Sequence, residues 1–391
     1  MEFDAIVLER LVDVVHTGCP FSNRPNCTWR TIGMPAEFGQ LPPLRWWVVA
    51  FAGFALLGLQ GFGLVAAATP QNLFDDHAPI ALEIEAPFHL LINDRVRESE
   101  YHAGSLRYQE AATGEVVIPL EIRTRGKTRR RKDICDFPPL RLRFTEADVE
   151  GTLFQGQRSL KLVTHCKDRD SYDRLVLQEY LAYRVYNLLT DYSHRVRLAQ
   201  INYVQQGRRS LVKRRGFLLE HWKSVAARND AIALDVDGGV NIKTLSAADA
   251  NRVAVFQYLI GNEDYSLLWP ETNSNCCHNS KPLFADNWVI PLPYDFDFAG
   301  IVNAPYAVPK PPNRSVRNRR YRGLCHTQGQ LADTLEFFRE RRTAIQALYR
   351  DEPGMGERER ASTLDYLDDF YAVIDDPEAV ERRLLRRCKK D

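Results

Sequence analysis

The chain has 391 residues, of which 45% are hydrophobic and 26% are charged. It is therefore long and apolar enough to bury at least one large core, which excludes an intrinsically disordered protein. Its 52 Lys and Arg residues nearly balance its 51 Asp and Glu residues, so no overall electrostatic attraction to nucleic acid is expected.

An apolar run near the N-terminus sets the first part of the chain apart. Residues 46–68 are apolar except for Gln60, follow Arg45 and end in three alanines. A run of this length could span a bilayer, but the basic residue before it and the small-residue end are typical of a secretory signal peptide. We interpret residues 1–33 as an upstream extension of the reading frame and residues 34–68 as a signal peptide or membrane anchor.

Export would place the rest of the chain in an oxidising compartment, periplasmic or extracellular, with membrane contact only through residues 46–68 if they are not cleaved. Six cysteines follow this run, an even number that favours one or more disulfides. They are Cys135, Cys166, Cys276, Cys277, Cys325 and Cys388. Six cysteines allow fifteen pairings, so the connectivity stays open. Cys276 and Cys277 are adjacent and lack the spacing of zinc ligands, so we interpret them as disulfide or loop residues.

Three segments between residues 75 and 155 have apolar residues at every second position, which is typical of β-strands. They are Ile80/Leu82/Ile84, Ile118/Leu120/Ile122 and Leu140/Leu142/Phe144. We predict a β-rich N-terminal region over residues 75–155. Residues 156–391 are predicted to form a core with C-terminal helices, which the periodicity places at residues 331–349 and 362–387.

A basic segment, residues 123–133, lies between the second and third of these strands and carries seven Lys and Arg residues around Gly126. It could be a solvated hairpin loop. It could equally be a phosphate clamp, because Gly126 lets backbone amides approach an anion while guanidinium groups such as that of Arg125 surround it. Nucleic-acid binding fits less well, since no aromatic residues are interleaved with the charges.

A further strand and a long helix follow. Leu160, Leu162 and Thr164 face one side of the strand, which leaves Lys161 on the other. The helix, capped by Asp170 or Ser171, has a buried stripe of Leu177, Leu181, Val185 and Leu188, and Glu179 lies outside that stripe. A strand lysine and a helix glutamate at this separation could form the ion pair that holds ATP phosphates in kinases. Both could also be surface residues.

A helix, a polar turn and an acidic strand end follow one another in residues 253–300. A capping box at Ser246 and Asp249 starts the helix, and Gly261 stands where it would end. Beyond it lie Asp264 and Asn279.

The chain then passes through an apolar run, residues 288–292, to Asp295 and Asp297. Together with Asp264 and Asn279, these acids could supply the oxygen ligands that magnesium prefers, with one carboxylate left as a base. Singly, each could be a turn, loop or strand-end residue.

The order of these motifs resembles the CotH family of spore-coat kinases and, more distantly, HipA-type kinases. The resemblance spans about residues 80–350. It is carried by Arg125-Gly126-Lys127-Thr128, Lys161, Glu179, a strand ending in Glu220, Asp264, Asn279 and Asp295. It implies a two-lobed α+β protein-kinase-like domain, with a β-rich N-terminal lobe and a helical C-terminal lobe.

The resemblance also implies transfer of the ATP γ-phosphoryl group to a protein side chain, with Mg²⁺ or Mn²⁺ as the metal. In this resemblance Asp264 is the base, and Asn279 and Asp295, with Asp297 as a further candidate, are the metal ligands. Phosphate would be bound by Lys161 paired with Glu179 and by Arg125 and Gly126. Glu220 would lie at the adenine side. Asn262, Asn273 and Asn275 are rivals of Asn279. The alternatives are a catalytically silent envelope scaffold and a protein that transfers AMP or an amino acid.

A loop rich in proline and arginine, residues 305–323, follows the carboxylate pair. Its basic residues are Lys310, Arg314, Arg317, Arg319, Arg320 and Arg322. An acidic protein substrate would suit this loop. Alternatively, the loop is solvated and has no binding role.

Overall fold

The computed structural model describes residues 72–96, 99–111, 113–208, 210–270, 275–309 and 314–390. The predicted export segment, residues 34–68, lies outside these ranges, as does the proposed upstream extension. Within the described ranges, the helices are all too short or too polar to cross a membrane.

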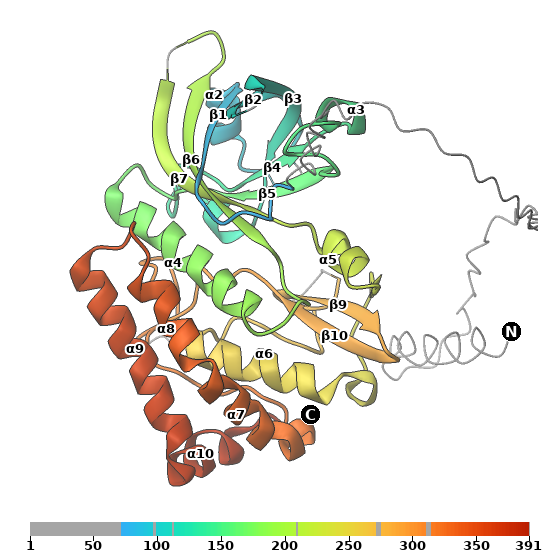
Figure 1. The fold of residues 1–391 in the computed structure, drawn as a ribbon, viewed down its shortest axis with the longest axis vertical. Helices are drawn as coiled ribbons and strands as arrows, with labels where there is room; N and C mark the ends of the chain where they lie inside the picture. The colour runs from blue at the N-terminus through green and yellow to red at the C-terminus, as the bar shows by residue number, and fades with distance from the viewer. Residues whose placement is uncertain are drawn as a thin grey trace, which may run out of the picture. The chain divides into compact units, whose positions relative to one another are not determined.

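The N-terminal strands close into a seven-stranded barrel (Figure 1). Its strand order is β1-β2-β3-β4-β5-β7-β6, and pairing of β6 with β1 closes it. The β1–β6 pair is parallel, with Ile80 opposite Ala199, whereas the other neighbours are antiparallel. The strands are β1 Ile80–Ala86, β2 His102–Glu110, β3 Gly114–Thr124, β4 Leu140–Arg143, β5 Ser159–Val163, β6 Val196–Gln205 and β7 Ser210–Leu219. The short helices α2 Phe88–Asn93 and α3 Glu146–Val149 belong to the same region.

The barrel interior is filled by the alternating apolar residues that predicted the strands. Ile84, Ile122 and Leu142 are fully buried there, and Leu120 nearly so. Successive side chains of a strand point to opposite faces, so this alternation places one face of each strand in the core. The predicted N-terminal strands are confirmed.

The predicted two-lobed protein-kinase-like domain is wrong. The chain combines a closed mixed barrel with a helical C-terminal region, and its N-terminal strands do not form the sheet of a kinase N-terminal lobe. Strands β5 to β7, between residues 159 and 219, complete the barrel, so the boundary placed after residue 155 falls inside it. Alternation reveals which face of a strand is buried but not which strand lies beside it, and closure depends on the neighbours.

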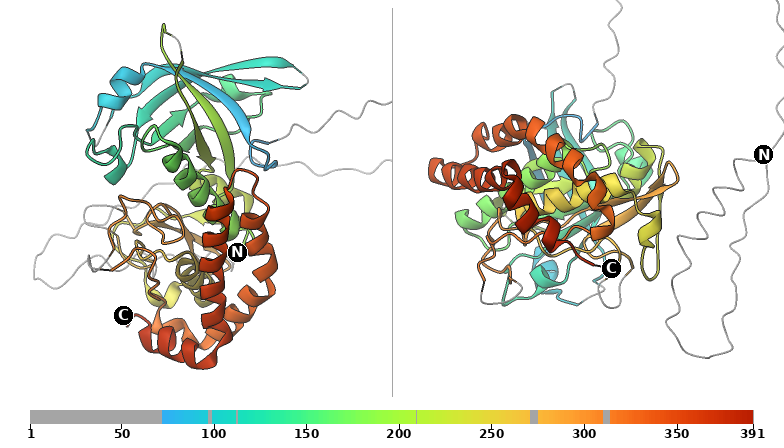
Figure 2. Two further views of the ribbon diagram at one scale, coloured as in Figure 1. Left: turned by 90° about the vertical axis from the view of Figure 1, so that its left-hand side faces the viewer. Right: turned by 90° about the horizontal axis from the view of Figure 1, so that it is seen from below.

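The C-terminal region consists of helices and a small sheet. The helices are α4 Asp170–Asn187, α5 Trp222–Arg228, α6 Ala247–Ile260, α7 Leu331–Glu340, α8 Arg342–Arg350, α9 Glu357–Asp375 and α10 Pro377–Arg383. The sheet has the order β10-β9-β8, with β8 Ile232–Ala233, β9 Ser280–Ala285 and β10 Trp288–Pro293. Helix α8 packs on α4, whereas α7 and α9 pack on α6; these C-terminal helices are the orange and red ones in Figure 2.

Helix α4 connects the two regions, because it packs on β6 and β7 of the barrel and on α8 (Figure 1). The predicted stripe of Leu177, Leu181 and Val185 is buried, but Leu188 is exposed. Glu179, predicted to lie outside the buried stripe, is also buried. A helix covered on several sides buries polar positions that its own periodicity marks as exposed.

Helix α6 begins and ends where the sequence predicts. Ser246 Oγ accepts a hydrogen bond from the backbone N–H of Asp249 at 3.3 Å and caps the first turn. Gly261 follows the last turn in the left-handed conformation, with φ of 69°. The turn at Gly261 directs the chain towards Asp264.

We expect Gly261→Ala to destabilise the protein markedly. An alanine in the left-handed conformation costs about 1–2 kcal/mol, and its Cβ would also overlap the hydroxyl of Tyr366. Chemical denaturation of the variant beside the wild type measures the effect. Gly329→Ala is the matched control, because a Cβ there meets no atom within 4 Å. Equal unfolding free energies for both variants would contradict this account.

The six cysteines form three disulfides, as their even number predicts. The pairs are Cys135–Cys166, Cys276–Cys277 and Cys325–Cys388. Such bonds persist in oxidising environments. The disulfides therefore indicate an extracytoplasmic compartment.

Candidate functional site

Seven of the nine residues predicted for the site line one cleft, with a volume of about 800 Å³. They are Arg125, Gly126, Lys161, Asp264, Asn279, Asp295 and Asp297. The first three come from the barrel, and the others come from loops beside the β9–β10 hairpin. Glu179 and Glu220 do not line the cleft.

The barrel contributes a cationic wall to this cleft. Arg141 on β4 lies opposite Lys161 on β5, and Arg125 lies beside them at the end of β3. Burial, reinforced by the charges of Arg125 and Arg141, lowers the pKa of Lys161 to about 7. Burial likewise lowers the pKa of Arg125. Crowded, desolvated cations of this kind favour the binding of an anion.

The turn at Gly126 contributes to this wall. Its φ of 88° is a conformation that glycine adopts freely. Lys127, Thr128 and Arg129 follow it along the cleft lining. Arg129 and Arg130 are buried, whereas Gly126, Lys127 and residues 131–133 are exposed, so the segment is solvated in part.

The opposite wall is acidic. Burial, together with the charge of Asp295, raises the pKa of Asp297 to about 7. Glu179, buried behind this wall, has its pKa raised well above the usual value by burial and by Asp297. A bound cation would relieve the mutual repulsion of these carboxylates.

Asp264 is fixed by hydrogen bonds to both of its carboxylate oxygens. His278 Nε2 lies 3.0 Å from Oδ1, and Asn279 Nδ2 donates to Oδ2 at 3.1 Å and to the backbone oxygen of Asp264 at 2.7 Å. The backbone N–H of Asp264 donates to Asn262 Oδ1 at 3.0 Å. With Nδ2 of Asn279 committed to Asp264, the amide oxygen is the atom that Asn279 can offer to a metal.

Two residues of the acidic wall have a left-handed backbone. The φ angles are 51° at Asn279 and 67° at Asp295, which is uncommon outside glycine and frequent at functional sites. Surrounding hydrogen bonds hold this geometry. The N–H of Tyr294 donates to Asn279 O at 3.0 Å, and the N–H of Asp295 donates to the hydroxyl of Tyr183 at 2.8 Å.

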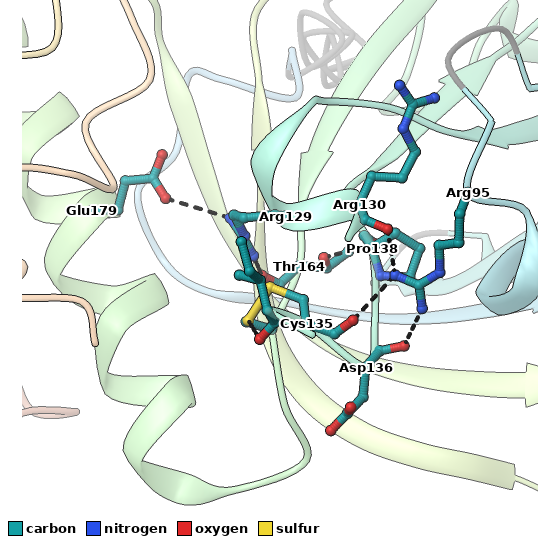
Figure 3. The surroundings of a disulfide bond; sticks show 10 residues. Arg95, Arg129, Arg130, Cys135, Asp136, Pro138, Thr164 and Glu179 are labelled. Atoms are coloured by element: carbon teal, nitrogen blue, oxygen red, sulfur yellow. Dashed lines mark hydrogen bonds and ion pairs between the residues drawn. A yellow bond between two sulfur atoms is a disulfide. The ribbon is translucent and has the colours of Figure 1, made fainter. Parts of the chain in front are cut away.

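The Cys135–Cys166 disulfide links the segment that follows the basic turn to the loop between β5 and α4 (Figure 3). Arg129 donates to the backbone oxygen of Thr164 and lies 3.9 Å from Glu179 Oε2. Glu179 therefore pairs with Arg129 instead of the predicted Lys161. The sequence suggested Lys161 because of its strand–helix spacing, whereas Arg129 reaches Glu179 from a turn bridged to the loop after β5.

Glu220, outside the cleft lining, is engaged in hydrogen bonds to the protein, and its predicted place at the adenine side stays a prediction. Its Oε1 accepts from Arg228 Nε at 3.0 Å, and its Oε2 accepts from the backbone N–H of Arg195 at 2.9 Å. The carboxylate is buried and joins β7 to α5 and to the start of β6.

The rivals of Asn279 are engaged elsewhere or lie outside the description. Asn262 Nδ2 donates to Gln257 Oε1 at 3.0 Å, and Asn275 Nδ2 donates to Asp235 Oδ1 at 2.8 Å. Asn273 is outside the described residues. Asn279 bonds to Asp264 through its side chain and accepts at its carbonyl from the N–H of Tyr294, the residue before Asp295.

The basic loop after the carboxylate pair is largely engaged in internal contacts. Arg319 donates to Leu259 O and packs on the Tyr366 ring, and Arg322 donates to Glu263 O at 2.9 Å. Lys310 is outside the described residues, and Arg320 is exposed. Most of these arginines therefore support the loop.

A second, smaller cavity of about 30 Å³ adjoins the cleft. Asp264 and Phe298 line both spaces. The small cavity is completed by Val308, Val316 and other loop residues. Asp264 thus lies where the two spaces adjoin.

Several residues that line the cleft were not predicted. Arg141 could have been found, because it alternates with Leu140 and Leu142 and so faces away from the barrel core. His278 directly follows Cys276 and Cys277, and no sequence pattern marks it as a site residue. Trp222 and Lys281 also line the cleft, and no local pattern marks them.

The acidic wall fits an oxygen-preferring divalent cation. Within the described ranges, no group of three or more His, Cys, Asp or Glu side chains forms a metal site by itself. The candidate set instead combines the amide oxygen of Asn279 with the carboxylates of Asp295 and Asp297. Mg²⁺ and Mn²⁺ accept such ligands, and Mg²⁺ commonly completes its shell with water and phosphate oxygens.

The sequence matches no protein-family model and no curated protein. A functional assignment therefore depends on the geometry of the cleft.

Proposed function

We propose that this chain transfers the γ-phosphoryl group of ATP to a hydroxyl of a protein side chain, with Mg²⁺ or Mn²⁺. The observation that supports this most directly is the opposition of charges in one cleft. The cationic wall of Arg125, Arg141 and Lys161 suits phosphate oxygens, and the acidic wall of Asp295 and Asp297 suits a metal ion. A metal–triphosphate complex carries both complementary charges.

The residues would divide the work as follows. Lys161, Arg125 and the turn at Gly126 bind phosphate oxygens. Asn279, Asp295 and Asp297 hold the metal, which when bound neutralises phosphate charge. Asp264 takes the proton of the acceptor hydroxyl while the hydroxyl oxygen forms a bond to the γ-phosphorus. The bond between the γ-phosphorus and the bridging oxygen breaks, and its electron pair leaves with ADP.

The small cavity suits the acceptor side. It shares Asp264 with the cleft, which supports an approach of the acceptor hydroxyl to this carboxylate from the side of the small cavity. Exposed Arg320 belongs to the loop whose Ser315 and Val316 line this cavity. We therefore propose an acidic protein as the acceptor.

The direct test uses the purified full chain, γ-labelled ATP, and Mg²⁺ or Mn²⁺, with dephosphorylated casein as an acidic acceptor. Metal-dependent label on casein or on the chain itself is the expected result. Label from α-labelled ATP would indicate AMP transfer instead. Failure to bind nucleotide with either metal would leave the catalytically silent scaffold.

The site of action follows from the N-terminal segment. We propose that residues 34–68 export the chain to the periplasm or beyond the cell, and that residues 46–68 anchor it if they are not cleaved. Fusion of residues 34–75 to a reporter active only outside the cytoplasm should give signal. Signal only from a cytoplasm-specific reporter would overturn the proposal.

ATP binding should be accompanied by proton uptake at Lys161. In the free protein its pKa of about 7 leaves the amine mostly neutral at pH 8, and bound phosphate raises the pKa towards its ordinary value. Binding of metal-free ATP at pH 8 should therefore take up about one proton. Calorimetry in buffers of different ionisation enthalpy measures this uptake.

Lys161→Met should abolish the uptake, whereas exposed Lys243→Met should retain it. Lys243 lies outside the cleft and serves as the matched control. Equal uptake by the two variants would show that the proton goes to another group.

A further inference from the structure

We infer that His278 is a positioning residue that fixes the orientation of Asp264 for the transfer step. The inference depends on the proposed phosphoryl transfer and adds a residue to it. Its basis is the contact between His278 Nε2 and Asp264 Oδ1, at 3.0 Å. His278 lines the cleft, and its side chain and that of Asp264 are each 24% exposed.

The second oxygen of Asp264 shows why one more contact matters. Asn279 Nδ2 donates to Oδ2 at 3.1 Å, so Asn279 restrains one side of the carboxylate. A second donor on the other oxygen restrains the rotation of the carboxylate about its Cβ–Cγ bond further. With His278 on Oδ1, both oxygens are fixed. Each still keeps a lone pair to receive the proton of an acceptor hydroxyl.

His278 itself projects from a firmly held turn. Its backbone N–H donates to Trp269 O at 3.1 Å, and its carbonyl accepts from the N–H of Ser266 at 2.9 Å. The preceding Cys276–Cys277 disulfide is buried, and Cys276 N–H donates to Val236 O at 2.9 Å. Val236, which precedes Asp264 in the sequence, and residues 266–269, which follow it, thus hold the turn that places the imidazole against the carboxylate.

The contact determines which ring nitrogen carries a proton. A carboxylate oxygen only accepts, so His278 must donate from Nε2–H. In this arrangement the Nε2 proton of His278 stays in the hydrogen bond to Asp264, and Asp264 is the group that takes the proton of the acceptor. Its effect is confined to the direction in which Asp264 presents its lone pairs, and small misplacement of a reacting group costs about 10²-fold in rate.

The test compares His278→Ala with His278→Gln in the full chain, using ATP, Mg²⁺ and dephosphorylated casein. His278→Ala should lower kcat by roughly 10- to 100-fold, while KM for ATP and calorimetric nucleotide binding stay unchanged. His278→Gln supplies an amide N–H at similar reach and should recover most of the loss. His326→Ala, an exposed histidine outside the cleft, is the control and should behave as the wild type.

Two results would overturn the inference while leaving the proposed function intact. One is an unchanged kcat in His278→Ala. The other is an equal loss in His278→Gln and His278→Ala, which would show that an N–H donor is not what matters.

If the wild type binds no nucleotide and transfers no label, the proposed function fails and the contact is tested separately. Ring-nitrogen NMR should show His278 protonated at Nε2, with a resonance that shifts in Asp264→Ala. An unshifted resonance would exclude the contact.

Discussion

Asp264→Asn should reduce phosphoryl transfer by about 10²- to 10⁴-fold, the range assigned to general acid–base catalysis. The amide keeps the size of the carboxylate and can still accept from His278 or Asn279 through its remaining oxygen. It has no lone pair basic enough to take the acceptor proton. Nucleotide and metal binding should persist, because the phosphate and metal positions belong to Lys161 and Asp295. Turnover measured beside calorimetric binding separates the two effects.

Loss of nucleotide binding in Asp264→Asn would contradict this division of roles and make Asp264 a metal ligand. Full turnover would remove it as the base. Thermal unfolding should show a small change, because the hydrogen bond to one of the two donors is lost.

Asp295→Ala should weaken magnesium-dependent nucleotide binding by about 10- to 100-fold, and activity should fall with it. The carboxylate is a proposed metal ligand, and its charge lies near both Arg125 and Lys161. Metal-free ATP should bind the variant at least as well as the wild type, because a negative charge beside the phosphates is gone. Calorimetry should therefore show weaker ATP binding by the variant with magnesium and equal or tighter ATP binding without it.

Asp295→Asn provides the matched control for backbone strain. Asp295 has φ of 67°, where asparagine is tolerated better than alanine. If strain caused the loss, the asparagine variant would bind magnesium–nucleotide normally. Equal weakening of metal-dependent and metal-free binding in Asp295→Ala would contradict metal ligation.

The strands and helix ends could be predicted because their signals are local. Ile84, Leu120 and Leu142 report their own burial through a period of two, and Ser246 and Gly261 mark the ends of α6 through capping chemistry. The closed barrel could not be predicted. It depends on parallel pairing between β1 and β6, and no local pattern encodes a partner so distant in the sequence.

The candidate site was predictable where its residues lie at element ends. Asp264 follows the C-terminal end of α6, and Asp295 follows the apolar strand β10, so the order of the elements in the sequence predicted both as site residues. The partners were not predictable. Glu179 meets Arg129, and Glu220 meets Arg228, through contacts that only the folded chain creates.

Closure of the barrel has a consequence for the order in which the chain folds. Strand β1 is the first barrel strand to emerge, yet its neighbour β6 follows only after β2 to β5 and α4. Until β6 arrives, one edge of β1 presents unpaired amide and carbonyl groups, and such edges template association between chains. Folding intermediates should therefore be prone to associate through this edge, and shortening the chain past Ile80 should leave an open sheet that aggregates.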